Sequence, residues 1–141
     1  MNDFIPAPGL GAAPRSTVTS TPKPFIRHTA VPDSDEHWFE IGPADERIAY
    51  ACVVQCRSFA WIEEIAVAPR HRGEGLASHI LDAIITAFGR QEIGLGATPF
   101  VPDSWKPKRS GLDAVQLRAW YRRHGFHAMS DGPHLYRAAD G

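Results

Sequence analysis

The sequence has few cysteines, and these do not suggest a disulfide framework. Its 141 residues include two cysteines, Cys52 and Cys56. They lie four residues apart in a segment with strand character, so both would point to one side of a strand and could not readily bridge. We expect free thiols in a reducing compartment, and no metal site.

Long apolar runs and a strong net charge are also missing. No apolar run approaches the roughly 20 residues that span a bilayer, and no basic-then-apolar stretch of signal-peptide form opens the chain. The formal net charge of −1 gives no whole-chain reason to expect nucleic acid. The sequence predicts a cytoplasmic protein without membrane contact, and nucleic acid is an unfavoured partner.

Proline is unevenly distributed and divides the chain in two. Residues 1–34 hold half of the 12 prolines, together with a Ser/Thr cluster. Such a stretch buries little apolar surface to offset the entropy of ordering it, so we expect a mobile N-terminal arm. The remaining residues 35–141 are expected to form one folded domain, because 43% hydrophobic and 22% charged residues are typical of a globular chain.

Apolar periodicity predicts strands and helices in the order β-β-β-α-β-α-β-β. The expected strands cover residues 37–41, 47–56, 60–68, 93–100, 126–129 and 134–137, and the expected helices cover residues 76–88 and 113–124. Gly89 ends the first helix, and Asp113 with Gln116 has capping-box spacing at the start of the second. The predicted fold class is α/β, with a mixed, mostly antiparallel central sheet and helices packed on it.

The turn before the first expected helix has the composition of an anion site. It reads Arg70-His-Arg72-Gly73-Glu-Gly75. Glycines lack a Cβ, so an anion can approach the free N–H groups of a helix N-terminus, and the arginines add positive charge. The third glycine of a dinucleotide fingerprint and the Gly-Lys-Ser/Thr of a triphosphate loop are missing. We expect a phosphate-bearing ligand; a plain glycine-rich connection is the alternative.

Two motifs in the expected order resemble the GNAT superfamily of acetyl-CoA-dependent N-acyltransferases. The strand ending Val67-x-Pro69, followed by the Arg-x-x-Gly-x-Gly pattern, resembles its coenzyme A signature. The stretch from Trp120-Tyr121 to Gly125-Phe126 is similar to the ending of its last helix. The resemblance implies a GNAT-like fold, acetyl-CoA as cosubstrate and no metal.

The N-terminal half is shortened relative to that pattern. The superfamily usually has a strand and two helices before its second strand, whereas residues 1–34 leave room for a short strand at most. The acceptor side is therefore expected to be unusually open or covered by another chain, which makes a homodimer one candidate assembly.

The resemblance implies roles for individual residues. Tyr121 would donate a proton to the departing sulfur, Glu63 would act as base through water, and Glu64 would contact the cationic amine. Strand alternation would send the two glutamates to opposite faces unless a bulge intervenes. The residues implied to bind coenzyme A are Ile65, Ala66, Val67, Arg70, Arg72, Gly73, Glu74, Gly75, Leu76 and Ala77.

The leading functional hypothesis is an enzyme that moves an acetyl group from acetyl-CoA to a primary amine. Because no cysteine lies near the motifs in sequence, we expect direct attack in a ternary complex. The acceptor is left open among a small cationic amine, an aminoglycoside-like compound and a protein amine. The alternative is a non-catalytic coenzyme A-binding or regulatory module that holds a macromolecular partner with the arm and the basic loop at residues 101–111.

Overall fold

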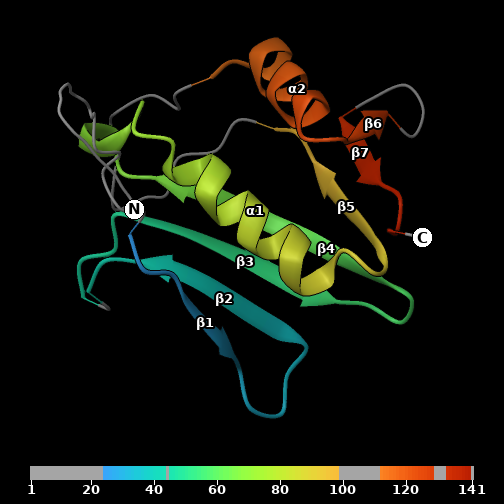
Figure 1. Cartoon of the computed structure of the whole chain (residues 1–141), viewed down its shortest axis with the longest axis horizontal. Helices are drawn as coiled ribbons and strands as arrows, with labels where there is room; N and C mark the ends of the chain where they lie inside the picture. The colour runs from blue at the N-terminus through green and yellow to red at the C-terminus, as the bar shows by residue number, and fades with distance from the viewer. Residues whose placement is uncertain (1–23, 44, 99–111, 129–132, 141) are drawn as a thin grey trace, which may run out of the picture.

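The structure, a computed structural model, describes residues 24–43, 45–98, 112–128 and 133–140. Its centre is a seven-stranded sheet in the order β1-β2-β3-β4-β5-β7-β6 (Figure 1). The elements are β1 (Arg27–Ala30), β2 (Glu36–Ile41), β3 (Ala49–Gln55), β4 (Phe59–Val67), the short 3-10 helix η2 (Pro69–His71), α1 (Leu76–Phe88), β5 (Glu92–Gly96), α2 (Ala114–Arg123), β6 (His127–Ala128) and β7 (His134–Arg137). Strands β4 and β5 run parallel and the other neighbours antiparallel, which confirms the predicted mixed sheet.

Strand β1 lies in the segment where the sequence left room for a short strand at most, and its bounds were not among the expected elements. It pairs antiparallel with β2, so the sheet begins at Arg27, inside the segment expected to be an arm. The chain reverses through a tight turn in which Asp33 takes a positive φ of 58° and the Val31 amide donates to the Glu36 carbonyl at 2.9 Å. The strand sequence RHTA has no alternating apolar pattern, so nothing local predicted it. Residues 1–23 lie outside the described residues.

Helix α1 forms where its apolar spacing predicts. Its buried stripe packs on one face of the sheet and consists of Leu76, Ile80, Leu81, Ile84 and Phe88. Figure 1 shows α1 lying across the central strands. The helix therefore fixes the position of the turn that precedes it, relative to β4.

Helix α2 begins with the predicted capping box. The Asp113 carboxylate accepts from the Gln116 amide at 2.8 Å, and the Gln116 side chain accepts from the Asp113 amide at 3.0 Å. The helix ends at Arg123, and Gly125 follows with a φ of 94°. These two ends orient α2 so that Tyr121 is buried against the core.

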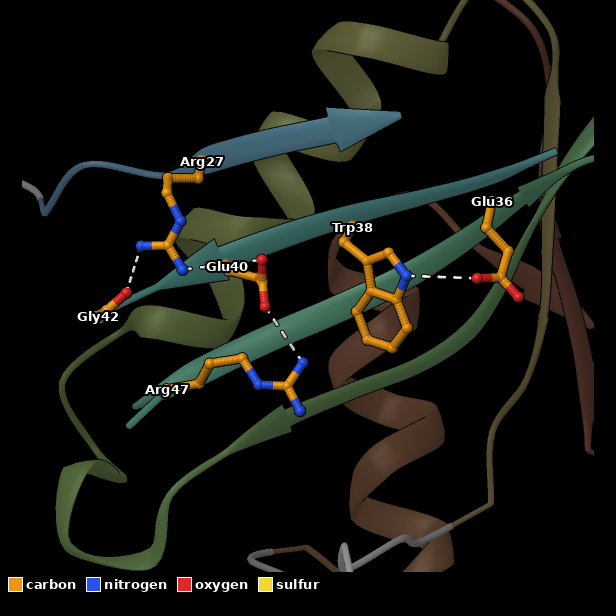
Figure 2. Close-up of polar contacts among 6 residues, drawn as sticks. All are labelled: Arg27, Glu36, Trp38, Glu40, Gly42 and Arg47. Carbon is orange, nitrogen blue, oxygen red and sulfur yellow. Dashed lines mark hydrogen bonds and ion pairs between the residues drawn. The ribbon is translucent and has the colours of Figure 1, made fainter. Parts of the chain in front are cut away.

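The central strands present two different faces. On the face covered by α1, Val53 of β3 lies opposite Ile62 of β4, and both belong to the apolar core. The opposite face, here called the open face, carries Trp38, Cys52 and Glu64 in one row across β2, β3 and β4. Figure 2 shows Trp38 in front of the strands with the helices behind them. Among the described residues, neither α-helix covers the open face.

Candidate active site

Strands β4 and β5 pair over only the first part of β4. Their parallel register runs from Phe59 opposite Glu92 to Ile62 opposite Leu95 and stops there. Strand β3 continues to pair with β4 as far as Val67. The β5-side edge of residues 63–67 therefore has no strand partner in the described part of the chain. An extended ligand can add to such an edge through main-chain hydrogen bonds.

A β-bulge places both predicted glutamates at this opening. Cys52 lies opposite Glu64 and Val53 lies opposite Ile62, so Glu63 is an extra residue in β4. The charges of Glu64 and Glu63 both contribute to raising the Cys52 pKa, so both carboxylates lie near that thiol. The sequence left two alternatives open, a regular strand or a strand with a bulge. The structure has the bulge, so Glu63 and Glu64 are not sent to opposite faces by simple alternation.

A cavity of about 810 Å³ occupies the split in the sheet. It is lined by Trp61, Ile62, Glu63, Glu64, Ile65, Ala66, Val67, His71, Arg72, Gly73, Gly75, Leu76, Ala77, Ser78, Leu95, Gly96, Thr98, Leu112, Leu117, Trp120 and Tyr121. Ile65 shares the α1 face with Ala51, whereas Glu64 shares the open face with Cys52. The cavity therefore connects the helix-covered side of the sheet with the open face.

The start of α1 forms one end of this cavity. Gly73 and Gly75 have φ values of 84° and 77°, and a Cβ built on either would meet no atom within 4 Å. The first intrahelical bond runs from the His79 amide to the Gly75 carbonyl at 3.0 Å. The amides before His79 are therefore free of partners within the helix. This geometry, with Arg72 beside it, suits a phosphate-bearing ligand.

Two of the predicted coenzyme A residues do not line the cavity. The Arg70 guanidinium lies 3.1 Å from Glu46, and both side chains are exposed. Glu74 faces His71, whose Nδ1 is 3.3 Å from its carboxylate. His71 itself lines the cavity and was missed, although its position between Arg70 and Arg72 was a signal.

Tyr121 is the polar side chain buried most deeply in the cavity wall. It is 6% exposed, and its ring packs against Phe126 and Trp120 at centroid distances of 5.6 and 4.8 Å. Burial raises the pKa of Tyr121, so the phenol remains protonated at neutral pH. Its hydroxyl makes no hydrogen bond with the described residues, and the cavity is therefore where a partner would lie.

Several lining residues were not predicted as site residues. Trp120 and Leu117 come from α2, and Leu95 and Gly96 come from β5. Only the tertiary structure brings them to β4. Two signals were nonetheless present in the sequence. Trp120 stands directly before Tyr121, and the apolar run at β5 indicates a buried strand.

Glu64 is held by a neighbour on the next strand. The Tyr50 hydroxyl donates a hydrogen bond to its carboxylate. Burial, together with the charge of Glu64, raises the pKa of Tyr50 to about 12. Tyr50 therefore serves as a protonated donor that fixes Glu64 at the cavity edge.

Cys52 lies beside the site, which corrects the expectation that no cysteine is near it. Its Cα is paired with that of Glu64 across β3 and β4. Burial, reinforced by the charges of Glu36, Glu64 and Glu63, raises the pKa of Cys52 to about 11. At neutral pH the side chain is therefore a thiol, which is a poor nucleophile. Cys56 is half-buried and likewise free, as predicted.

In the described part of the chain, no cluster of three or more His, Cys, Asp or Glu side chains is arranged to hold a metal ion. Neither helix of that part is both long and apolar enough to cross a membrane.

Comparison with known proteins gives a consistent family. The family model described as "Acetyltransferase (GNAT) domain" matches residues 33–128. A GNAT-family protein from Bacteroides thetaiotaomicron is 18% identical with a TM-score of 0.52, covering 78% of this chain and 65% of that one. An acyl-CoA N-acyltransferase from Pseudomonas aeruginosa is 20% identical with a TM-score of 0.53, covering 74% and 68%.

A third similar structure is a complex with coenzyme A. The PaiA N-acetyltransferase from Thermoplasma acidophilum, solved in complex with coenzyme A, is 14% identical with a TM-score of 0.50, covering 74% of this chain and 61% of that one. No curated protein sequence matches the chain. At these identities the structural likeness shows the fold, and the chain spans less than two thirds of some of these proteins. The family model covers most of the described residues, and the chain belongs to the GNAT acetyltransferase family.

Proposed function

We propose that this protein transfers an acetyl group from acetyl-CoA to a primary amine by direct attack in a ternary complex. Membership of the GNAT family supports acyl transfer in general. The observation that carries the finer proposal is the cavity in the split sheet. It joins an anion-binding helix end to the buried Tyr121 and to the bulge with Glu63 and Glu64.

The helix end would hold the coenzyme. The backbone amides from Gly73 to Ala77 include those of the left-handed Gly73 and Gly75, which both line the cavity and have open space where a Cβ would stand. The coenzyme A pyrophosphate would bind there, with the Arg72 guanidinium adding positive charge. The unpaired edge of Glu64 to Val67 would hydrogen-bond the pantetheine amides as an added strand. A related fold with coenzyme A bound supports this choice of cosubstrate.

Side chains of the cavity would then accept and donate the protons of the reaction. Glu63 is exposed at the bulge and would accept, through a water, the proton that an ammonium group must lose before its nitrogen can attack. The neutral nitrogen forms a bond to the thioester carbon, and the carbon–sulfur bond breaks. Tyr121 gives its proton to the departing thiolate and regains one from the nitrogen through solvent. Glu64, held by Tyr50, would keep the cationic amine in place before transfer.

Thiol release from acetyl-CoA with a panel of primary amines tests this function. We expect amine-dependent release, and we expect Tyr121→Phe to lower kcat at least 100-fold, within the range of about 10²–10⁴ for general acid–base catalysis. Phenylalanine keeps the ring packing on Phe126. Tyr136→Phe is the matched control, since Tyr136 lies in β7 outside the cavity lining.

Coenzyme A affinity separates the two functional hypotheses. Binding measured by calorimetry should be unchanged in Tyr121→Phe, because the hydroxyl acts on the transfer step. Tight coenzyme A binding without thiol release on any amine would instead support the non-catalytic module.

A further inference from the structure

Part of the cavity lies beside a stretch of β5 whose open-face positions are both glycine. Trp61 lines the cavity on the open face, because its register partner Val54 is two residues from Cys52. Gly94 is the parallel partner of Trp61, and Gly96 follows on the same face of β5. Next to Trp61, strand β5 therefore contributes backbone alone to the open face at these two positions.

The Trp61 side chain is held in place by its neighbours. A Cβ added at Gly94 would stand 3.0 Å from Cε3 and 3.1 Å from Cζ3 of the Trp61 indole, so the indole edge occupies the space that a side chain would need. The His134 ring meets the indole at an interplanar angle of 75°, with centroids 5.7 Å apart. A side chain fixed in this way loses little further freedom when a ligand packs against it. Trp61 is therefore a preformed aromatic wall of the cavity.

The space above Gly96, here called the glycine slot, is open. Gly96 is exposed and lines the cavity, whereas Gly94 is buried under Trp61. A Cβ added at Gly96 would meet one atom of the described residues within 4 Å, the His134 Cδ2 at 3.7 Å. Gly96 has no positive φ, so its backbone does not require glycine. The missing side chain thus leaves room for a ligand beside the Trp61 wall.

Negative charge in the cavity is confined to one place. Glu63 and Glu64 are the only carboxylates among its described lining residues, and they follow Trp61 by two and three positions in β4. Two positions along a strand correspond to about 7 Å. An amine held by the two glutamates therefore reaches Trp61 and the glycine slot with a substituent of that length. No further carboxylate of the described residues lines the cavity there to pair with a second cation.

We propose that the acceptor is a small primary amine with a flat apolar group, such as a phenyl ring, about three carbons from its nitrogen. The amine lies at Glu63 and Glu64, and the ring packs on Trp61 in the glycine slot, in the offset or edge-on geometry that aromatic pairs prefer. This substrate class rests on the proposed transfer reaction. Trp61 and Gly96 are then the residues that determine acceptor specificity.

Propylamine and 3-phenylpropylamine test the proposal, because they share the amine and the carbon chain and differ in the ring. We expect kcat/KM for 3-phenylpropylamine to exceed that for propylamine by about 10-fold or more, from burial of the ring and its contact with the indole. Gly96→Val should lower this ratio by about fivefold or more, because the valine side chain fills the glycine slot while suiting a strand. Trp61→Leu should also lower the ratio, because it removes the aromatic wall.

Trp38→Leu is the matched control, since Trp38 lies on the open face but does not line the cavity. It should leave the ratio unchanged. Gly96→Val removes no side-chain contact, so it tests the glycine slot even if Trp61→Leu loses stability. Equal kcat/KM for the two probes, or a ratio unchanged in both variants, would overturn the proposal even though transfer occurs. A higher kcat/KM for spermidine than for 3-phenylpropylamine would also overturn it, because the acceptor would then be a polycation.

Calorimetric binding of the same two probes in the presence of coenzyme A gives a readout independent of turnover. Tighter binding of 3-phenylpropylamine that is lost in Gly96→Val would support the place of the ring in the glycine slot even if no thiol is released, in which case only the transfer reaction fails. Equal binding of the two probes would overturn this specificity, whether or not thiol is released.

Discussion

Single side chains at this site owe their chemistry to their neighbours. Cys52 would be an ordinary thiol on an exposed strand, but here it is buried opposite Glu64 and its pKa is raised to about 11. Tyr121, similarly, stays protonated because it is buried at the end of α2. Burial thereby keeps Cys52 from acting as a nucleophile and leaves Tyr121 with a proton that it can donate.

Cys52→Ala should therefore leave the rate of thiol release within about threefold of the original protein. Removing the small side chain should cost about 1 kcal/mol of unfolding free energy, as is common for single substitutions. Mass spectrometry after mixing with acetyl-CoA alone should show no acetylated protein. Direct attack would be contradicted by an acetyl group on Cys52 that is also found in a Cys56→Ala variant. Such an acetyl group should disappear only when Cys52 itself is replaced.

At the scale of elements, the site depends on two local departures from regular structure. The bulge at Glu63 brings both carboxylates to one opening, and the parallel pairing that ends at Ile62 leaves the rest of β4 free on one edge. The left-handed Gly75 then starts α1 with its amides directed at the same cavity. Each departure exposes backbone or polar groups that regular pairing would have used.

Gly75→Ala should weaken coenzyme A binding about 10-fold or more. A Cβ at this position would project into the space that the phosphates are proposed to occupy. The left-handed φ should also cost about 1 kcal/mol of stability. Calorimetric titration with coenzyme A measures the first effect and urea unfolding the second.

Gly125→Ala is the control for this change. Gly125 has a φ of 94° but does not line the cavity. It should lose similar stability without losing coenzyme A affinity. If both variants bind coenzyme A as the original protein does, the helix end is not the phosphate site.

At the scale of the whole molecule, the sheet has a histidine pair at its β1 edge. His28 Nε2 lies 3.0 Å from His37 Nδ1, and the His28 ring stacks on Phe39 at 4.2 Å while the His37 ring meets Phe88 edge-on at 5.1 Å. Burial, together with the charge of His37, lowers the pKa of His28. The neutral form of His28 is thus the one that favours the folded sheet.

The free energy of unfolding should consequently fall as the pH drops below about 6.5, the ordinary histidine value. A lowered folded-state pKa contributes stability that is present above the unfolded pKa and is lost as the pH falls through the folded one. Urea unfolding across this range should show a shallower decline for His28→Gln than for the original protein. His127→Gln replaces an exposed histidine and is the control, which should keep the original slope. If the original protein and both variants decline with the same slope, the His28–His37 pair does not cause the pH dependence.

The sequence by itself determined α1, the capping box of α2, the glycine turn and the family motifs around Tyr121. These are local: apolar spacing, a side chain that caps its own helix and glycines that permit positive φ all act within a few residues. It did not determine β1, because an edge strand with no apolar alternation is stabilised only by pairing with β2.

Only the tertiary structure decided how the site is assembled. The position of Glu63 depends on a register shift between β3 and β4, and the place of Cys52 beside Glu64 depends on that same pairing. Such non-local contacts are set by the packing of the whole sheet, and no short stretch of sequence encodes them.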